Sequence, residues 1–356
     1  MVTDRTLTAG PLPTDTDEAS ITGSAATGSP RRSTQSRLPS LTGLRFFAAL
    51  AVFFFHASLP FPNLRLIRDD GLAAAMARAS AQAGGLGVTF FFVLSGFVLT
   101  WSARDTDTAR AFLRRRYVKI CPNYVVAWVL AMVLFAGTST PAWRAIVNLL
   151  MVQSWVPDFN TNFSVDPPSW SLGAEAVFYA LFPVLFFLIR RIQRHHLKFW
   201  IWGVVAGIVA TPLIAYLAIP GGAPFMPNAP STSSVQYWFG YVLPLPRVLD
   251  FALGILVARA VAAGRWRNIG MVWSGVLLVV SYVIASVVPE IYGQRAICII
   301  PIALLIAAAA IADSDGRFTL FRNRVTIWLG NISFAFYLLH YIVLAYYGSR
   351  TWDHGW

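Results

Sequence analysis

The chain has 356 residues, of which 56% are hydrophobic and only 12% are charged, and its mean hydropathy is +0.59. Because soluble domains carry roughly 25% charged residues, this composition argues against a soluble protein and predicts an integral membrane protein. The net charge of +12 could also fit a nucleic-acid partner. The arginines, however, form short clusters between apolar runs instead of lining one polar face, so we expect no nucleic-acid binding.

The first 37 residues are rich in Thr, Ser, Gly, Pro and Asp and contain almost no large apolar residues. Such a segment buries too little surface to offset the entropy of ordering it, so we expect a disordered cytoplasmic tail. It also lacks the apolar core of a signal peptide.

Nine apolar runs that are long enough, or nearly long enough, to cross a bilayer follow the tail. They cover about 41–59, 84–101, 118–136, 170–189, 199–219, 237–258, 269–288, 294–312 and 327–347. A tenth run, 143–155, is too short unless its flanks extend it. Uninterrupted apolar runs form helices rather than barrel strands. We therefore predict an all-α fold, a polytopic transmembrane bundle of about nine or ten helices over 38–347, with a short C-terminal tail at 348–356.

Basic residues are divided unevenly between the expected loops. With a cytoplasmic N-terminus and a run at 143–155 that does not span, the inner segments hold 19 basic residues and the outer segments hold 4. This division follows the positive-inside rule. A full span at 143–155 would place the basic loop 190–198 outside, so we expect a re-entrant or tilted half-helix there. The expected location is a plasma membrane, the inner membrane of a bacterium, where membrane lipids surround the bundle.

Ionisable side chains inside apolar runs are candidates for function, because charges are costly in hydrocarbon. Arg45 and His56 lie eleven positions apart on the first expected helix, within about 20° of one face and roughly 16 Å apart along the axis. Each alone suits a structural role, with Arg45 reaching the headgroups and His56 bonded to a neighbouring helix. As an aligned pair they favour a functional stripe.

Glu175 is the one glutamate inside an expected span, five residues into a helix that enters from the outside. We therefore expect it at a depth similar to that of His56. A carboxylate beside an imidazole orients the ring and stabilises its protonated form, so the two residues predict a base and its orienting partner. A structural pair of Glu175 with an arginine is the alternative.

Arg114, Arg115 and Arg116 precede the third expected span, and Lys119 lies one turn further in. Arginine side chains bind phosphate oxygens in a bidentate fashion, so this cluster predicts a phosphate clamp. It also serves topology, and the two roles are compatible.

Three further ionisable residues lie in expected spans. Arg247 and Asp250 have the spacing of an ion pair within one helix, which is more often architecture than catalysis, and His340 suits a hydrogen bond between helices. The two cysteines and the adjacent histidines of the 190–198 loop do not have the spacing of metal ligands, so we expect no metal.

Five motifs in this chain resemble, in order, those of the membrane-bound acyltransferase family 3. The first is LTGLRFFAAL, continuing to His56, in which an arginine and a histidine are separated by ten residues. The others are FFFVLSGF at 90–97, RRRYVKICP at 114–122, SWSLGAE at 169–175 followed by FY at 178–179, and LGNIS at 329–333 continuing to His340. The resemblance extends over about 38–347.

The resemblance implies transfer of an acetyl or longer acyl group from acyl-CoA to a hydroxyl of a cell-envelope glycan, a lipid-linked sugar or a macrolide antibiotic. Direct transfer with His56 as general base and an acyl-histidine intermediate both remain open. The residues concerned are His56 and Glu175 for catalysis; Arg45, Arg114, Arg115, Arg116 and Lys119 for the donor; and Ser95, Trp170, Tyr179, Arg247, Asp250 and His340 as candidates for the substrate cavity.

Two departures from the family pattern are visible. Ala176 stands where a second acid usually follows the first, which argues against a paired-carboxylate mechanism. The chain also ends soon after the last expected helix, so we do not expect the hydrolase-like domain that some members append. A multi-helix transporter is the alternative from another class, but it predicts internal repeats that the sequence does not have. A membrane scaffold is a third option, and it gives no reason for Arg45 and His56 to share a face.

Overall fold

A computed structural model describes residues 38–352, apart from 62, 63, 65, 68, 105, 106, 227 and 228. The chain separates into two units, Met1–Gln35 and Ser36–Trp356, and the structural statements below concern the second unit. The expected tail at 1–37 lies outside the described residues.

The described part is mainly helical and has almost no strand, which confirms the expected all-α class. Its helices are α1 (Pro39–Ala57), α2 (Asp70–Ser80), α3 (Ala83–Trp101), α4 (Ala109–Ala131), α5 (Ala142–Leu149), α6 (Phe159–Asn162), α7 (Trp170–Arg190), α8 (Leu197–Ala218), α9 (Ser234–Tyr237), α10 (Pro244–Ala262), α11 (Gly270–Ala285), α12 (Ile299–Ser314) and α13 (Arg324–Trp352). Two short strands, β1 (Phe225–Met226) and β2 (Ala229–Ser233), form an antiparallel hairpin in which Phe225 faces Ser233.

All nine expected spans are helices in the structure. Eight helical segments of the described residues are long and apolar enough to cross a membrane, and the ninth run forms the 16-residue helix α11. The segment at 143–155 contains α5, whose eight residues rise about 12 Å, far less than the roughly 30 Å of a bilayer core. The structure departs from expectation at 60–83, where α2 continues almost directly into α3, and at 348–352, where α13 extends into the expected tail.

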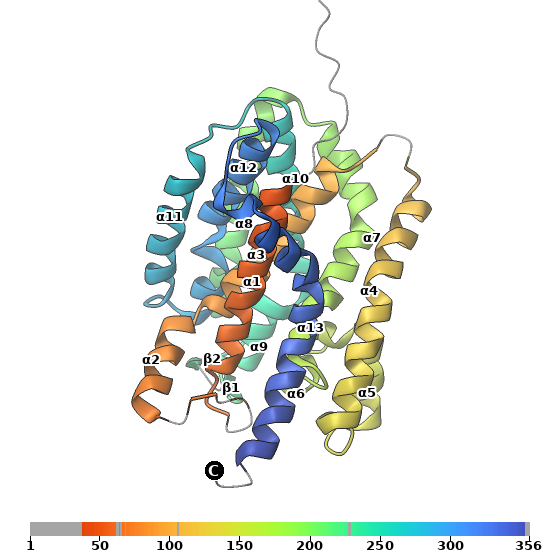
Figure 1. Ribbon diagram of the computed structural model, residues 1–356, viewed down its shortest axis with the longest axis vertical. Coiled ribbons are helices and arrows are strands. Elements are labelled where there is room, and N and C mark those ends of the chain that lie inside the picture. Colours follow the sequence, from red (N-terminus) through yellow and green to blue (C-terminus); the bar gives the residue numbers. More distant parts are fainter. Residues whose placement is uncertain are drawn as a thin grey trace, which may run out of the picture. The chain divides into compact units, whose positions relative to one another are not determined.

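α3 and α10 lie at the centre of the bundle, and α1, α7, α8 and α12 each pack on one or both of them (Figure 1). Their backbones approach closely at two glycines. A Cβ added to Gly96 would lie 2.0 Å from the carbonyl oxygen of Phe251, and one added to Gly254 would lie 2.0 Å from that of Val93. Small residues of this kind allow transmembrane helices to pack tightly.

α1 and α13 form a second close pair, in which a Cβ on Gly330 would lie 1.9 Å from the carbonyl oxygen of Thr42. This contact matters for the site, because it brings the first and last expected spans side by side.

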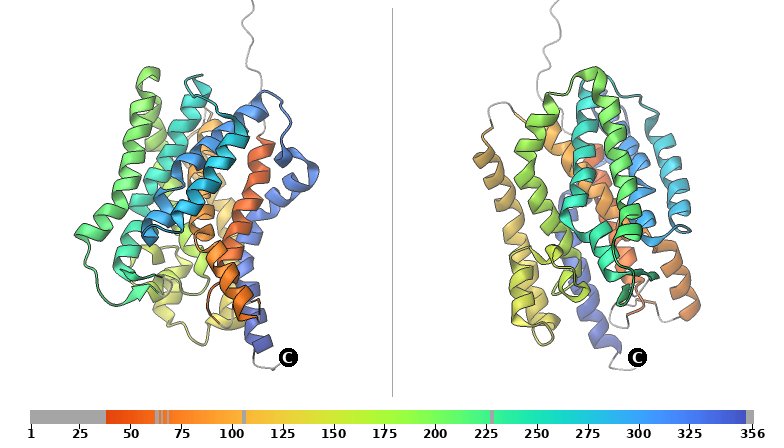
Figure 2. Two further views of the ribbon diagram at one scale, coloured as in Figure 1. Left: turned by 90° about the vertical axis from the view of Figure 1, so that its left-hand side faces the viewer. Right: turned by 180° about the vertical axis from the view of Figure 1, so that it is seen from behind.

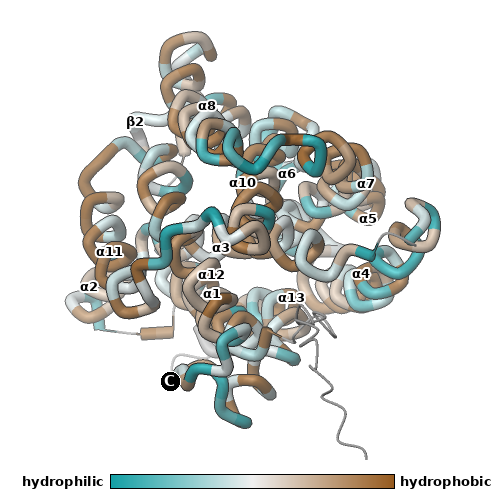
Figure 3. The backbone as a smooth tube through the Cα atoms, turned by 90° about the horizontal axis from the view of Figure 1, so that it is seen from above, coloured by the Kyte–Doolittle hydropathy of each residue, from teal (hydrophilic) through white to brown (hydrophobic). Residues whose placement is uncertain are grey.

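The basic loops gather at one end of the bundle. The connections that follow α7, α10 and α12 lie in the upper part of Figure 1, whereas α2, α5, α6 and the β-hairpin lie at the lower end. The two further views in Figure 2 agree. Seen from above, the loops after α7 and α10 are hydrophilic and the helices are mainly hydrophobic (Figure 3). The loops that we expected to be basic thus lie at one end of the bundle, and the loops with few basic residues lie at the other end.

Candidate active site

A cavity of about 330 Å³ opens between α1, α3, α4, α7 and α13. This volume lies within the range of small-molecule sites, about 300–1,000 Å³. Its polar lining consists of Arg45, Ser95, Arg116, Lys119, Asn123, Ser171, Glu175, Tyr179, Asn331, Ser333 and Tyr337. The sequence motifs of five separate helices therefore meet in one place.

Glu175 is the single carboxylate of this cavity, and it is held by two hydroxyl groups. Ser95 Oγ donates to its Oε1 over 3.3 Å, and the Tyr179 hydroxyl donates to the same oxygen. Arg45 and Lys119 lie close enough for their charges to act on Glu175. Among the described residues, Glu175 is hydrogen-bonded to Ser95 and Tyr179, and the contacts of His56 are with Val52 and His340 instead of with Glu175.

The position of Glu175 follows from the segment before α7. We expected this helix to begin at the outer membrane surface, but the preceding residues 153–169 fold into the bundle. Gln153, Ser154 and Ser169 have no exposed surface, and Asp166 is 1% exposed. α7 therefore begins inside the bundle, and Glu175 lines the same cavity as Arg45.

Helical periodicity separates the four basic residues of the 114–122 motif on α4. Arg116 and Lys119 line the cavity, whereas Arg114 and Arg115 are exposed, and Arg115 forms an ion pair of 2.7 Å with Asp107. Successive residues of a helix point about 100° apart, so the three consecutive arginines cannot all face one cavity. Only two of the four basic residues that we expected in the phosphate clamp on α4, Arg116 and Lys119, therefore line the cavity.

Arg116 offers an unused hydrogen-bond donor. Its Nε is buried and has no hydrogen-bond partner within the described residues, although its guanidinium lies over the ring of Phe112 at 5.5 Å. Together with Arg45 and Lys119 it gives the cavity three cations against one carboxylate. Buried donors without partners are rare in native proteins, so this end of the cavity fits an anionic ligand.

His56 is paired with His340. Nε2 of His340 lies 3.0 Å from Nδ1 of His56, which also lies 3.0 Å from the carbonyl oxygen of Val52. Nδ1 of His340 lies 2.7 Å from the carbonyl oxygen of Tyr337. His340 was expected as a candidate for lining the substrate cavity, and the structure instead places it beside the histidine of α1.

These contacts define the tautomers of both neutral rings. A carbonyl oxygen only accepts, so Nδ1 of His340 carries the hydrogen and its Nε2 is an acceptor. Nδ1 of His56 then faces two acceptors, the Val52 carbonyl and His340 Nε2, and must donate. The lone pair of His56 is therefore on Nε2, which has no hydrogen bond within the described residues and can accept a proton.

Each histidine of the pair contacts a tyrosine ring that lines one of two separate cavities. On one side, the ring of Tyr337 contacts His340 at 5.9 Å and lines the cavity of Glu175. On the other side, the ring of Tyr341 contacts His56 at 5.4 Å and lines a second cavity, of about 270 Å³. The polar lining of this second cavity is Ser139, Thr140, Arg144, Asn160, Ser164 and Tyr341.

Arg247 and Asp250 lie outside both cavities, although we expected them as candidates for the substrate cavity. Asp250 bridges Arg247 at 2.9 Å and Arg295 at 3.4 Å, and all three side chains are completely buried. Arg247 also donates to Thr89 on α3 over 3.1 Å. This network joins α10, α3 and the π-helical turn Tyr292–Ala296, so it holds the centre of the bundle together.

Two outcomes concern residues that the sequence placed differently. Trp170 packs against Phe92 and Tyr241, with ring centroids 6.2 and 5.1 Å apart, and does not line the cavity. Arg295 was missed, because it stands at the edge of an apolar run where a basic residue needs no partner. The sequence signal that could have identified Arg295 is that it is the one charged residue of an otherwise uncharged apolar run, 294–312.

Metal ligands were not expected. Among the residues that the structure describes, no group of three or more His, Cys, Asp or Glu side chains is arranged to hold a metal ion.

The helical bundle and its motif-lined cavity define a class of membrane enzyme, and the comparisons agree. The acyltransferase 3 family, described as an acyltransferase domain, matches residues 38–356, and the chain belongs to this family. It is 39% identical over 317 residues to acyltransferase MdmB of Streptomyces mycarofaciens, which covers 87% of this chain and 80% of that protein.

More distant relatives come from Staphylococcus aureus. A putative O-acetyltransferase of strain COL is 24% identical and O-acetyltransferase OatA of strain NCTC 8325 is 23% identical, over 89% and 88% of this chain. The chain spans about half the length of these two relatives, 52% and 51%. No solved structure matches the chain.

These findings confirm that the chain is a multi-pass membrane protein and an enzyme that transfers acyl groups. They do not support the transporter alternative.

Proposed function

We propose that this enzyme transfers an acyl group, acetyl or longer, from acyl-CoA to a hydroxyl of a sugar, a cell-envelope glycan or a macrolide-type natural product. The observation that carries the proposal is the hydrogen-bonded pair of His56 and His340, which contacts the lining of two cavities, one of them basic. A transferase for two substrates needs a base that both can approach.

We place the enzyme in a bacterial inner membrane with its N-terminus in the cytoplasm. Support comes from the basic loops at the upper end of Figure 1, which the positive-inside rule assigns to the cytoplasm. The cavity with Arg116 and Lys119 then receives its ligand from the cytoplasmic side, where acyl-CoA is made, and the cavity lined by Tyr341 opens toward the other side.

The donor is bound through its phosphates. Arg45, Arg116 and Lys119 supply three cations at the basic end of the cavity, and the free Nε of Arg116 supplies a donor to a phosphate oxygen. Ser95 and Tyr179 hold Glu175 in place, and the carboxylate keeps Arg45 oriented through its charge. In this role Glu175 is a positioning residue rather than the orienting partner of His56.

The acceptor hydroxyl approaches from the cavity lined by Tyr341, whose hydroxyl and amide groups suit a polyhydroxylated ligand. Nε2 of His56 takes the hydroxyl proton as the oxygen attacks the thioester carbonyl. The tetrahedral intermediate collapses by breaking the carbon–sulfur bond, and the departing thiolate takes the proton from the imidazolium. The products are the ester and free CoA, and His56 returns to its neutral form.

His340 assists by accepting the hydrogen bond from Nδ1 of His56. This contact holds the reactive tautomer and stabilises the imidazolium that forms during proton transfer, as the third group of a catalytic triad does. An acyl-His56 intermediate is the variant mechanism, since the same Nε2 can attack the thioester.

The test uses purified enzyme in lipid nanodiscs with radiolabelled acetyl-CoA and a panel of hydroxylated acceptors. General-base catalysis contributes about 10²- to 10⁴-fold, so His56→Ala should lose at least a hundredfold in turnover while donor binding remains. His196→Ala, an exposed histidine in the loop before α8, is the matched control and should be fully active. Label on the protein in the absence of acceptor would identify the acyl-histidine variant. Near wild-type turnover by His56→Ala contradicts both mechanisms.

A further inference from the structure

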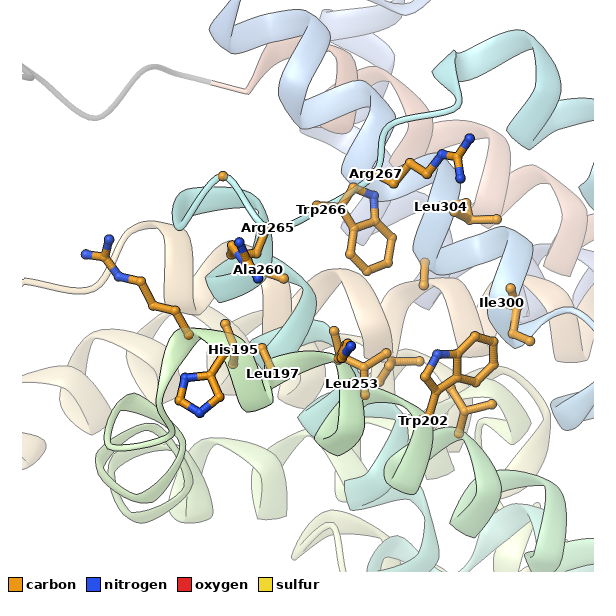
Figure 4. A pocket seen from close by; sticks show the side chains of 16 residues that line it. His195, Leu197, Trp202, Leu253, Ala260, Arg265, Trp266, Arg267, Ile300 and Leu304 are labelled. Carbon is orange, nitrogen blue, oxygen red and sulfur yellow. The ribbon is translucent and has the colours of Figure 1, made fainter.

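A further cavity, of about 550 Å³, is separate from the candidate active site, and Figure 4 shows the side chains that line it. It lies between α8, α10 and α12 toward the upper end of the bundle and shares no lining residue with the two cavities beside the histidine pair. α8 and α12 both pack on α10, and α8 meets the turn Tyr292–Ala296 that precedes α12.

The mouth of the cavity is basic. Arg194, His195 and Lys198 come from the start of α8 and the loop before it, and Arg265 and Arg267 come from the loop after α10. All five are exposed, and none forms an ion pair with an acidic side chain within the described residues. Two loops about seventy positions apart thus place four formal positive charges around one opening, and no acidic residue lines it.

Below this mouth the wall is apolar. Ile201, Trp202 and Val205 of α8 face Leu253 of α10 and Ile300 of α12, and Figure 4 shows Trp202, Leu253 and Ile300 on the side of the cavity away from Arg265. Trp202 is 61% exposed and Ile300 is 40% exposed. An apolar slot of this kind, open at the surface of a membrane-embedded bundle, accepts a hydrocarbon chain.

We propose that this cavity binds one anionic glycerophospholipid of the cytoplasmic leaflet. Arg265, Arg267 and Lys198 bind the phosphate and headgroup, and one acyl chain lies in the slot formed by Trp202, Leu253 and Ile300. Basic pockets between transmembrane helices on the cytoplasmic side recognise anionic lipids, and arginine matches phosphate oxygens in a bidentate fashion. The leaflet follows from the orientation proposed above, whereas the ligand chemistry follows from the cavity alone.

A purely topogenic cluster does not explain this arrangement. Arg190, the last residue of α7, and Arg191, which follows it, contribute equally to the positive-inside rule. They lie over the ring of Phe187, at 5.2 and 3.8 Å, and do not line the cavity. The convergence of Arg265 and Lys198 on an apolar slot is a separate feature. Arg190 and Arg191 therefore serve as matched controls of identical charge.

The experiment measures lipid binding without turnover, so its outcome is independent of acyl transfer. Delipidated full-length protein in detergent is titrated with phosphatidylglycerol or phosphatidylcholine, and native mass spectrometry counts bound lipid while a thermal melt records stability. We expect one phosphatidylglycerol per chain, with at least tenfold preference over phosphatidylcholine, and a higher melting temperature. Arg265→Gln/Arg267→Gln should lose about tenfold in affinity, and Arg190→Gln/Arg191→Gln should bind as wild type.

A second variant tests the slot without changing charge. Ile300→Trp fills the space expected to hold the acyl chain and should weaken phosphatidylglycerol binding even though all five basic residues remain. Equal loss in the two double-arginine variants contradicts the site. If inorganic phosphate competes with phosphatidylglycerol at a similar affinity, the cavity is only an anion site. If CoA displaces the lipid and Arg265→Gln/Arg267→Gln raises the donor KM, the cavity binds the acyl donor. Either result overturns the proposal.

Discussion

Replacing His340 by leucine tests the tautomer assignment most directly. Leucine removes the acceptor that faces Nδ1 of His56 but fills a similar volume in a position that is only 4% exposed. The Val52 carbonyl, 3.0 Å from the same nitrogen, remains and continues to hold the reactive tautomer of His56. The change should therefore weaken stabilisation of the imidazolium without abolishing the base.

The expected size follows from the loss of one hydrogen bond to a charged group. Such a bond contributes about 1.5–3 kcal/mol, and about 1.36 kcal/mol corresponds to a factor of ten in rate. His340→Leu should therefore lower kcat by about 10- to 150-fold, and His56→Ala, which removes the base itself, should lower kcat further. The donor KM should stay unchanged, because the basic lining of the cavity is intact.

The assay records kcat and donor KM with purified enzyme, together with the thermal midpoint of each variant. His340→Gln keeps an amide oxygen within reach of His56 Nδ1 and should recover most of the rate, which a purely structural role of the ring does not predict. A wild-type kcat in His340→Leu refutes the assisting role of His340. A loss of kcat as large as that of His56→Ala also refutes this role, because it makes His340 the residue that carries the proton.

Three further predictions concern other parts of the molecule. Burial raises the pKa of the Asp166 carboxyl well above its ordinary value, and neither oxygen has a hydrogen-bond partner within the described residues. The folded protein thus keeps a proton that the unfolded chain releases near pH 4, and stability falls as pH rises from there through the raised pKa. Thermal melts of Asp166→Asn should therefore exceed wild type at neutral and alkaline pH and converge with it near pH 4; a constant difference contradicts the assignment. Asp250→Asn leaves two buried arginines without a counter-charge and should destabilise the fold by about 3–5 kcal/mol, seen as a large drop in melting temperature, whereas an unchanged melt excludes an ionic role. Arg116→Ala should raise the donor KM more than it lowers kcat. Arg115 is exposed and paired with Asp107, so Arg115→Ala is the control and should leave the donor KM unchanged. Equal effects of the two changes on the donor KM contradict the placement of the phosphate clamp.

The sequence by itself determined the class of protein, the positions of its long helices and the sign of the charge on its connecting loops. Run length against bilayer thickness is a local property, as is the charge of a connecting loop, so neither needs a tertiary contact. The same locality placed Arg45 and His56 on one face of α1, and it explains why 143–155 was recognised as too short to cross. The motifs identified the family without reference to the fold.

Only the tertiary structure decided which of these residues meet. His56 and His340 are 284 positions apart, and their contact depends on how closely α1 and α13 pack at Gly330. Glu175 was misplaced because the inward fold of 153–169 changes where α7 begins, which hydropathy does not register. The rotation of α4 about its axis turns Arg116 toward the cavity and Arg114 away from it, which the sequence alone does not fix. A helix carries its own periodicity, but its depth and its partners are set by the helices that it packs against.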